Sequence, residues 1–126
     1  MKRTSICVVR TTLEADLMSD TKQRPYYAVI FSSERTHGDQ EDYDAMASRM
    51  VELAGQQPGF LGIESVRDSD GSGITVSYWR DMESIKAWKN VAEHKEAQRL
   101  GREQWYRSFK LRICRVEDEY SFDTAE

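Results

Sequence analysis

The chain has 126 residues, of which 39% are hydrophobic and 32% charged, and its formal net charge is −4. This length fits one domain with a single core and is too short for two. A negative net charge argues against a general nucleic-acid or acidic-membrane surface, because phosphate binding needs a concentrated positive field. No uninterrupted apolar stretch approaches the roughly 18 residues that cross a bilayer. We therefore expect no integral membrane protein.

The two cysteines, Cys7 and Cys114, lie far apart and belong to no CxxC or Cys/His cluster. They predict neither a zinc site nor a disulfide framework, and we interpret them as reduced thiols in a cytoplasmic protein. The N-terminal Met-Lys-Arg is followed by a four-residue apolar core that ends at Arg10. Such a short core predicts no export signal.

Residues 1–25 are expected to form a tail, mobile or extended, in front of a domain spanning residues 26–122. The stretch 14–24 is polar, has no periodicity and ends before Pro25. Residues 123–126 are expected to form a short C-terminal tail.

Aromatic and β-branched residues fill positions 26–33 and predict a first strand. Its alternation places Tyr26, Ala28 and Ile30 on one side and Tyr27, Val29 and Phe31 on the other. Asp39 is then expected to cap an amphipathic helix that ends near Gly55. The apolar positions that recur there at spacings of three and four are Tyr43, Met46, Ala47, Met50, Leu53 and Ala54.

A hairpin is predicted next, with strands at 60–67 and 73–79 joined by a turn at 68–73. In the first of these strands, alternation puts Glu64 on the same face as Phe60, Gly62 and Val66. Asp81 is expected to cap a second helical region. The helical pattern continues through Trp105, either unbroken or with one break. Alternation over 108–116 predicts the last strand.

This order of elements is that of the α+β, ferredoxin-like sandwich, an antiparallel sheet with two helices on one face. Helices can cover only one face of such a sheet, yet both faces of the first strand are apolar. A second copy of the chain is the simplest cover for the other face. We therefore expect a homodimer packed through its sheet faces.

Several segments are informative through their order along the chain, namely Pro58-Gly59-Phe60-Leu61-Gly62-Ile63-Glu64-Ser65, Gly73-Ile74-Thr75-Val76-Ser77-Tyr78-Trp79, Trp88, Glu93-His94, Ala97 and Gly101-Arg102-Glu103-Gln104-Trp105-Tyr106. Through this ordered set the sequence resembles the antibiotic biosynthesis monooxygenase family over about residues 26–122. The resemblance implies a dimeric α/β barrel, with one pocket in each subunit between sheet and helices. Characterised members include oxygenases that oxidise quinols or phenols with dioxygen and without metal or flavin, and relatives that bind and degrade haem.

Oxidation without a cofactor needs a base, donors that stabilise an oxyanion and an apolar cavity. His94 is the candidate base, because a neutral imidazole titrates near working pH. A structural or solvated histidine is the alternative. Tyr78, Tyr106 and Arg67 are the candidate donors, and the candidate substrate-binding wall consists of Phe31, Trp79, Trp88 and Trp105. Trp88 equally fits a core position.

No metal site is expected, since His37 and His94 are not at ligand spacing. The haem-degrading relatives place a histidine ten residues after a tryptophan, whereas counting ten from Trp88 reaches Gln98. The basic residues between 95 and 107 alternate with glutamates and predict a solvated, ion-paired helix face.

The sequence thus predicts a monooxygenase that uses no cofactor and oxidises a small phenol- or quinol-like substrate. Two alternatives stay open. One is a dimer of the same fold that binds a small ligand, or serves in a stress response, without catalysis. The other is a haem-binding or haem-degrading enzyme.

Overall fold

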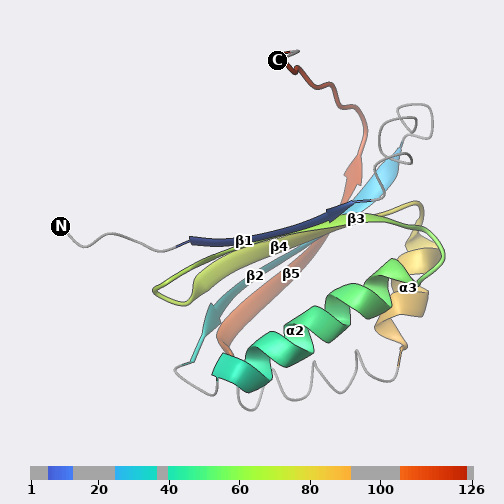
Figure 1. Ribbon diagram of the computed structural model, residues 1–126. Helices are drawn as coiled ribbons and strands as arrows, with labels where there is room; N and C mark the ends of the chain where they lie inside the picture. The colour runs from blue at the N-terminus through green and yellow to red at the C-terminus, as the bar shows by residue number, and fades with distance from the viewer. Residues whose placement is uncertain (1–5, 13–24, 37–39, 92–105, 125–126) are drawn as a thin grey trace.

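The computed structural model describes residues 6–12, 25–36, 40–91 and 106–124. Within them, strands of one antiparallel sheet lie above helices that all cover the same face (Figure 1). The elements in chain order are β1 (Ile6–Thr12), β2 (Tyr26–Arg35), α2 (Gln40–Gly55), β3 (Phe60–Asp68), β4 (Ser72–Trp79), α3 (Met82–Lys89) and β5 (Tyr106–Val116).

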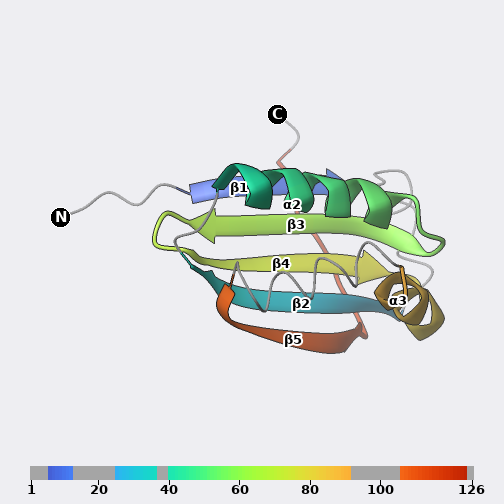
Figure 2. The same cartoon turned by 90° about the horizontal axis from the view of Figure 1, so that it is seen from below.

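The sheet has the strand order β1-β3-β4-β2-β5, which Figure 2 shows face-on. Without β1, this is the strand order of the ferredoxin-like fold, with β2 and β4 in the centre. The fold class predicted from the sequence is therefore confirmed. Both central strands are bordered on each side, so the alternation of their side chains decides what lies on each face of the sheet.

The first of the five strands lies inside the segment that the sequence predicted as a tail. β1 pairs with β3 from Ile6 opposite Asp68 to Thr12 opposite Gly62 and thereby extends the sheet at its edge. Only its short apolar run of residues 6–9 marked it in the sequence. The expected division into tail and domain stays a prediction, although part of the expected tail belongs to this sheet.

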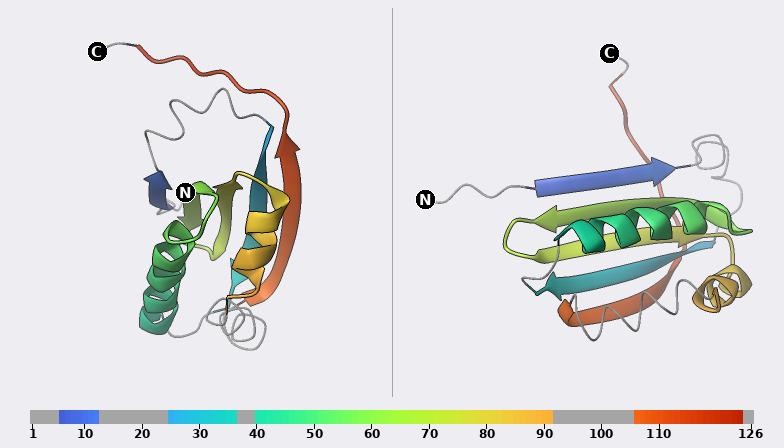
Figure 3. Two further views of the ribbon diagram at one scale, coloured as in Figure 1. Left: turned by 90° about the vertical axis from the view of Figure 1, so that its right-hand side faces the viewer. Right: turned by 60° about the horizontal axis from the view of Figure 1, so that its bottom comes forward.

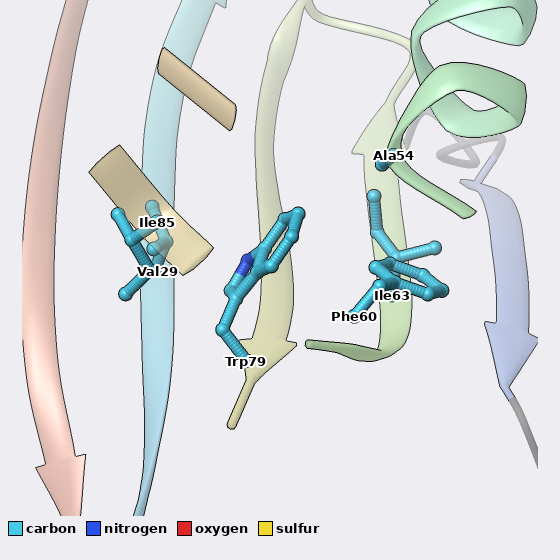
Figure 4. Packing of buried hydrophobic residues seen from close by; sticks show 6 residues of the cluster. All are labelled: Val29, Ala54, Phe60, Ile63, Trp79 and Ile85. Atoms are coloured by element: carbon cyan, nitrogen blue, oxygen red, sulfur yellow. The ribbon is translucent and has the colours of Figure 1, made fainter. Parts of the chain in front are cut away.

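The face of the sheet toward the helices, here called the inner face, carries the core. Val29 from β2 and Trp79 from β4 lie there with the helix residues Ala54 and Ile85, all buried (Figure 4). Trp79 is fully buried and its indole nitrogen donates to Ser77 Oγ at 2.9 Å. This bond satisfies the one polar group that the large ring brings into the core.

The opposite side, here called the outer face, carries the alternate residues of the same strands. Tyr26 and Ala28 are buried there, and the Tyr26 ring meets the Tyr78 ring edge-on with 6.1 Å between centroids. No described helix covers this face (Figure 3). Towards the turn between β3 and β4, Val66 and Ile74 are paired in register and are 43% and 50% exposed.

A β-bulge corrects one expectation about β3. The register slips between Phe60 and Gly62, so Phe60 packs into the inner core while Glu64 lies with Gly62 and Val66 on the outer face. The sequence had placed Phe60 and Glu64 on one face, because strict alternation takes no account of an inserted residue. Glu64 is half-buried there.

The helix α3 begins as predicted at an Asp81 cap. The Asp81 carboxylate accepts from the Ser84 backbone N–H at 2.8 Å and from the Ser84 hydroxyl at 2.7 Å. These bonds lower the pKa of Asp81, the side-chain bond contributing most. The cap sets where α3 starts and so places Ile85 over the core.

Among the helices of the described residues, none is long and apolar enough to span a membrane.

Candidate functional site

The inner face changes character along its length. At the α3 end it is apolar, with Val29, Phe60 and Trp79 in the core. Towards the β3–β4 turn, the same alternation brings polar residues to positions that helices would ordinarily cover with apolar ones. They are Ser33 and Arg35 of β2, Ser65 and Arg67 of β3, and Thr75 and Ser77 of β4.

Two of the small hydroxyl residues in this polar half form a hydrogen bond with each other. Ser65 Oγ and Thr75 Oγ1 lie 2.7 Å apart across the β3–β4 pair. Their short side chains fill little volume over the centre of the sheet, in contrast to the tryptophan at the other end. A polar region beneath helices is more typical of a ligand site than of a core.

Arg67 lies across this region because the neighbouring strand has no side chain in its way. It pairs in register with Gly73, where an added Cβ would come within 2.8 Å of the Arg67 Cζ atom. The guanidinium donates to the Gly71 carbonyl at 2.6 Å and to Ser33 Oγ at 2.7 Å. The glycine and the two acceptors hold the cation in one place.

Two tyrosines from distant parts of the chain meet beside this cation. The Tyr106 hydroxyl, at the start of β5, donates to the Tyr43 hydroxyl of α2 at 3.2 Å. The Arg67 Cζ atom lies 5.7 Å and 6.0 Å from the centroids of the Tyr43 and Tyr106 rings. The buried Arg35 stacks on Tyr43 at 3.7 Å. We call Ser33, Arg35, Tyr43, Arg67 and Tyr106 the polar cluster.

The phenol of Tyr106 stays protonated in this environment. Burial raises its pKa well above the ordinary range of tyrosine, and Tyr43 raises it further, while Arg67 and Arg35 act in the opposite direction. A phenol with a raised pKa serves as a hydrogen-bond donor at neutral pH and not as a base.

Aromatic rings border the cluster on the β5 side. Phe31 lies 5.3 Å from Tyr106 and 5.3 Å from Phe109, measured between ring centroids. Tyr106 also meets Phe109 edge-on at 6.0 Å. The donors of the cluster thus sit beside a wall that suits a flat, apolar ligand.

The structure brings three of the predicted site residues together, namely Phe31, Arg67 and Tyr106. Trp79 and Trp88 stack at 5.9 Å and belong to the packing of the apolar half, the core position that the sequence held open for Trp88. Tyr78 lies on the outer face against Tyr26, so it does not share a face with Tyr106. His94 and Trp105 lie outside the described residues.

Sequence reasoning missed Tyr43, Arg35 and Ser33. Tyr43 had been assigned to the apolar side of its helix, and Arg35 comes after a register shift between Glu34 and Arg35. One signal could have found Ser33 and Arg35. They continue the alternation of Val29 and Phe31, so two polar residues stand at positions where a buried strand is otherwise apolar.

No three His, Cys, Asp or Glu side chains of the described segments gather closely enough to hold a metal ion. Both histidines of the chain lie outside those segments. The polar cluster consists of hydroxyls and guanidiniums, which bind organic anions rather than metal ions.

A shallow hollow of about 700 Å³ lies on the other side of the sheet, at the turn end of the outer face. Val66, Ile74, Lys110 and Arg112 contribute to its lining.

Comparison with known proteins places these features in context. Residues 26–100 match the sequence profile described as antibiotic biosynthesis monooxygenase. The chain is 50% identical to the uncharacterised protein YqjZ of Bacillus subtilis over 107 residues, which are 85% of this chain and 93% of YqjZ.

A more distant relative is the jasmonate monooxygenase of Pyricularia oryzae, 29% identical over 94 residues. The match covers 71% of this chain but only 43% of that longer protein. Among solved structures, SnoaB of Streptomyces nogalater, a cofactor-independent oxygenase, superimposes with a TM-score of 0.61 at 14% identity, over 80% of this chain and 97% of SnoaB. At this identity the likeness is one of fold.

Proposed function

Since the chain belongs to the antibiotic biosynthesis monooxygenase family, we propose that it oxidises a small phenol- or quinol-like substrate with dioxygen and without a tightly bound cofactor. The observation that carries the proposal is the polar cluster beside the Phe31 ring on the inner face. The oxygenases among its relatives and structural neighbours support the oxygenase part. The phenol- or quinol-like substrate is what the resemblance implies, and the Phe31 ring beside the donors of the polar cluster supports it.

Such a reaction needs no external reductant. A phenol with a free para position first loses its proton, and the resulting anion can give an electron to dioxygen. One oxygen atom then enters the ring to give a quinone, and the other leaves as water with two hydrogens from the substrate. The substrate supplies all four electrons, so the protein has only to bind, orient and stabilise charge.

The residues of the polar cluster suit these tasks. The protonated Tyr106 would donate a hydrogen bond to the substrate oxyanion, and the positive charge of Arg67 nearby would stabilise that oxyanion through its field. Phe31 and the Tyr43 ring would border the substrate plane. The proposal keeps His94 as the base, a role predicted from the sequence alone.

Oxygen uptake tests this function. Protein treated with a chelator and dialysed is mixed with 1-naphthol in an oxygen electrode, with product read as 1,4-naphthoquinone absorbance. We expect one dioxygen consumed per quinone formed, with slower uptake by His94→Ala and Arg67→Gln. The matched control is Arg80→Gln, an exposed arginine at the α3 end of the sheet.

Two results would overturn parts of this proposal. Uptake no faster than in protein-free buffer, for 1-naphthol and for an electron-rich quinol alike, removes the reaction. Tight binding of the phenol without uptake would favour the ligand-binding alternative. An unchanged rate in His94→Ala removes that residue from the mechanism.

We further propose that the chain works as a homodimer that covers its outer face with a second copy. Val66 and Ile74 are exposed side by side on that face, and Ile30 and Val76 lie next to them in the adjacent row of the sheet. Contiguous apolar positions on a sheet face favour a partner of the same kind.

A further inference from the structure

The polar cluster holds a cation whose charge no described carboxylate balances. Arg67 is half-buried, and its two hydrogen bonds go to neutral acceptors, the Gly71 carbonyl and Ser33 Oγ. Its remaining contacts are with the faces of Tyr43 and Tyr106. Among the described side chains, none with a carboxylate forms an ion pair with it.

A second guanidinium lies in the same cluster. Arg35 is 8% exposed, and its Cζ atom lies 3.7 Å from the centroid of the Tyr43 ring, the ring that Arg67 faces at 5.7 Å. Tyr106 brings no negative charge, because its pKa is raised. Arg67 is therefore a partly desolvated cation beside neutral phenols, and it creates a local positive potential that an anion would lower.

From this arrangement we infer that Arg67 binds a carboxylate carried by the aromatic substrate. The inference rests on the proposed function, since it concerns the substrate of the same site. Arg67 has five N–H donors in a planar fork, and the two bonds to Gly71 and Ser33 leave three of them. The fork matches the two oxygens of a carboxylate, whereas a phenolate offers one.

A purely structural role for Arg67 makes a different prediction. As a link between the β3–β4 turn and β2, Arg67 would affect stability and would weaken all ligands alike on removal. As an anion-binding residue, it discriminates between ligands of equal shape that differ in charge. The experiment therefore compares such a pair.

The probes are 2-naphthoate and 2-naphthamide, titrated into the full-length protein by calorimetry at pH 7. We expect 2-naphthoate to bind at least about tenfold more tightly than the amide, as a charge-assisted bidentate contact does. Arg67→Gln should weaken 2-naphthoate about tenfold and leave 2-naphthamide within about twofold. Arg80→Gln, with the same loss of charge at the other end of the sheet, should change neither.

If Arg67→Gln does not fold by circular dichroism, Arg67→Lys takes its place. It keeps the charge but loses the fork, so we expect a smaller loss of 2-naphthoate affinity and again none for the amide. Equal affinity of the wild type for both probes overturns the inference, as does binding of neither. Equal losses for both probes in the variant assign Arg67 a structural role and overturn it too.

The two proposals fail separately. A preference for 2-naphthoate in a protein that takes up no oxygen leaves the carboxylate site standing and removes the reaction. Oxygen uptake with 1-naphthol and no preference between the probes leaves the reaction standing and removes the carboxylate site.

Discussion

Gly73 is the residue that allows Arg67 to lie across the sheet. An added Cβ there would come within 2.8 Å of the Arg67 Cζ atom and 2.9 Å of the Val66 carbonyl oxygen. The first atom belongs to a side chain that can move, whereas the second is backbone and can shift only with its strand. Even a methyl group at this position would therefore clash with the Arg67 side chain and with the backbone of β3.

We expect Gly73→Ala to lower the free energy of unfolding by about 1–3 kcal/mol, the usual cost of overpacking. Urea unfolding measures it. The matched control is Gly55→Ala at the end of α2, where an added Cβ meets nothing within 4 Å. Alanine there should leave stability unchanged or raise it by up to about 1 kcal/mol.

A double-mutant cycle separates the two clashes of Gly73→Ala. If the arginine contributes, the penalty is smaller in an Arg67→Ala background, and the remainder belongs to the Val66 carbonyl. A penalty no larger than that of Gly55→Ala would contradict the tight contact.

At this scale the sequence predicted part of the site. Arg67, Tyr106 and Phe31 were named for their chemistry, and they lie together. Tyr43 and Arg35 were missed because their contact depends on how α2 packs against the end of β2. A register shift between Glu34 and Arg35 also separates Arg35 from the regular pairing of the strand, so local spacing did not indicate the contact. The role of each residue stays a prediction.

At the scale of the elements, the α3 cap is a local device with a defined pH dependence. Asp81 accepts two bonds from Ser84, and these lower its pKa. A carboxyl group with a lowered folded-state pKa adds stability above its unfolded pKa of about 3.9, and this contribution is lost as the pH falls through the folded-state value.

We expect Asp81→Ala to reduce the free energy of unfolding at pH 7 by about 1 kcal/mol, and Asp81→Asn by less, because the amide oxygen still caps the helix. At pH 3 the difference between wild type and Asp81→Ala should be smaller. Denaturant unfolding at both pH values measures it. A difference that is the same at pH 3 and pH 7 would exclude a contribution from the carboxylate charge.

Most elements of the sheet were predictable because their patterns are long. Alternation and turn residues located β2, β3, β4 and β5, and the cap located α3. Two features were not predictable from periodicity. The bulge between Phe60 and Gly62 inserts one residue into β3, so Glu64 lies on the face opposite to Phe60 instead of on the same face. The edge strand β1 is short, and it is defined by its pairing with β3 rather than by its own pattern.

At the scale of the whole molecule, the two faces of the sheet differ in how their apolar residues are covered. The inner face is covered by helices, and the outer face leaves Val66 and Ile74 exposed in one cross-strand pair. The segment after β5 leaves the sheet on the side away from the helices (Figure 1), and it carries Tyr120 and Phe122, 96% and 77% exposed. Together with the exposed pair on the outer face, these rings offer apolar surface to a partner.

The proposed dimer predicts that a charge at Ile74 separates the subunits. Ile74 is 50% exposed, so a lysine there costs the single chain little, whereas in a face-to-face dimer it would bury a cation in an apolar contact. We expect sedimentation of the wild type at twice the mass of one chain and of Ile74→Lys at the mass of one chain.

The matched control is Ala87→Lys on the exposed side of α3, which should remain dimeric. A wild type that sediments as a single chain at micromolar concentration contradicts the dimer. A dimer that survives Ile74→Lys instead places the contact elsewhere, and the exposed Tyr120 and Phe122 then become the next surface to alter.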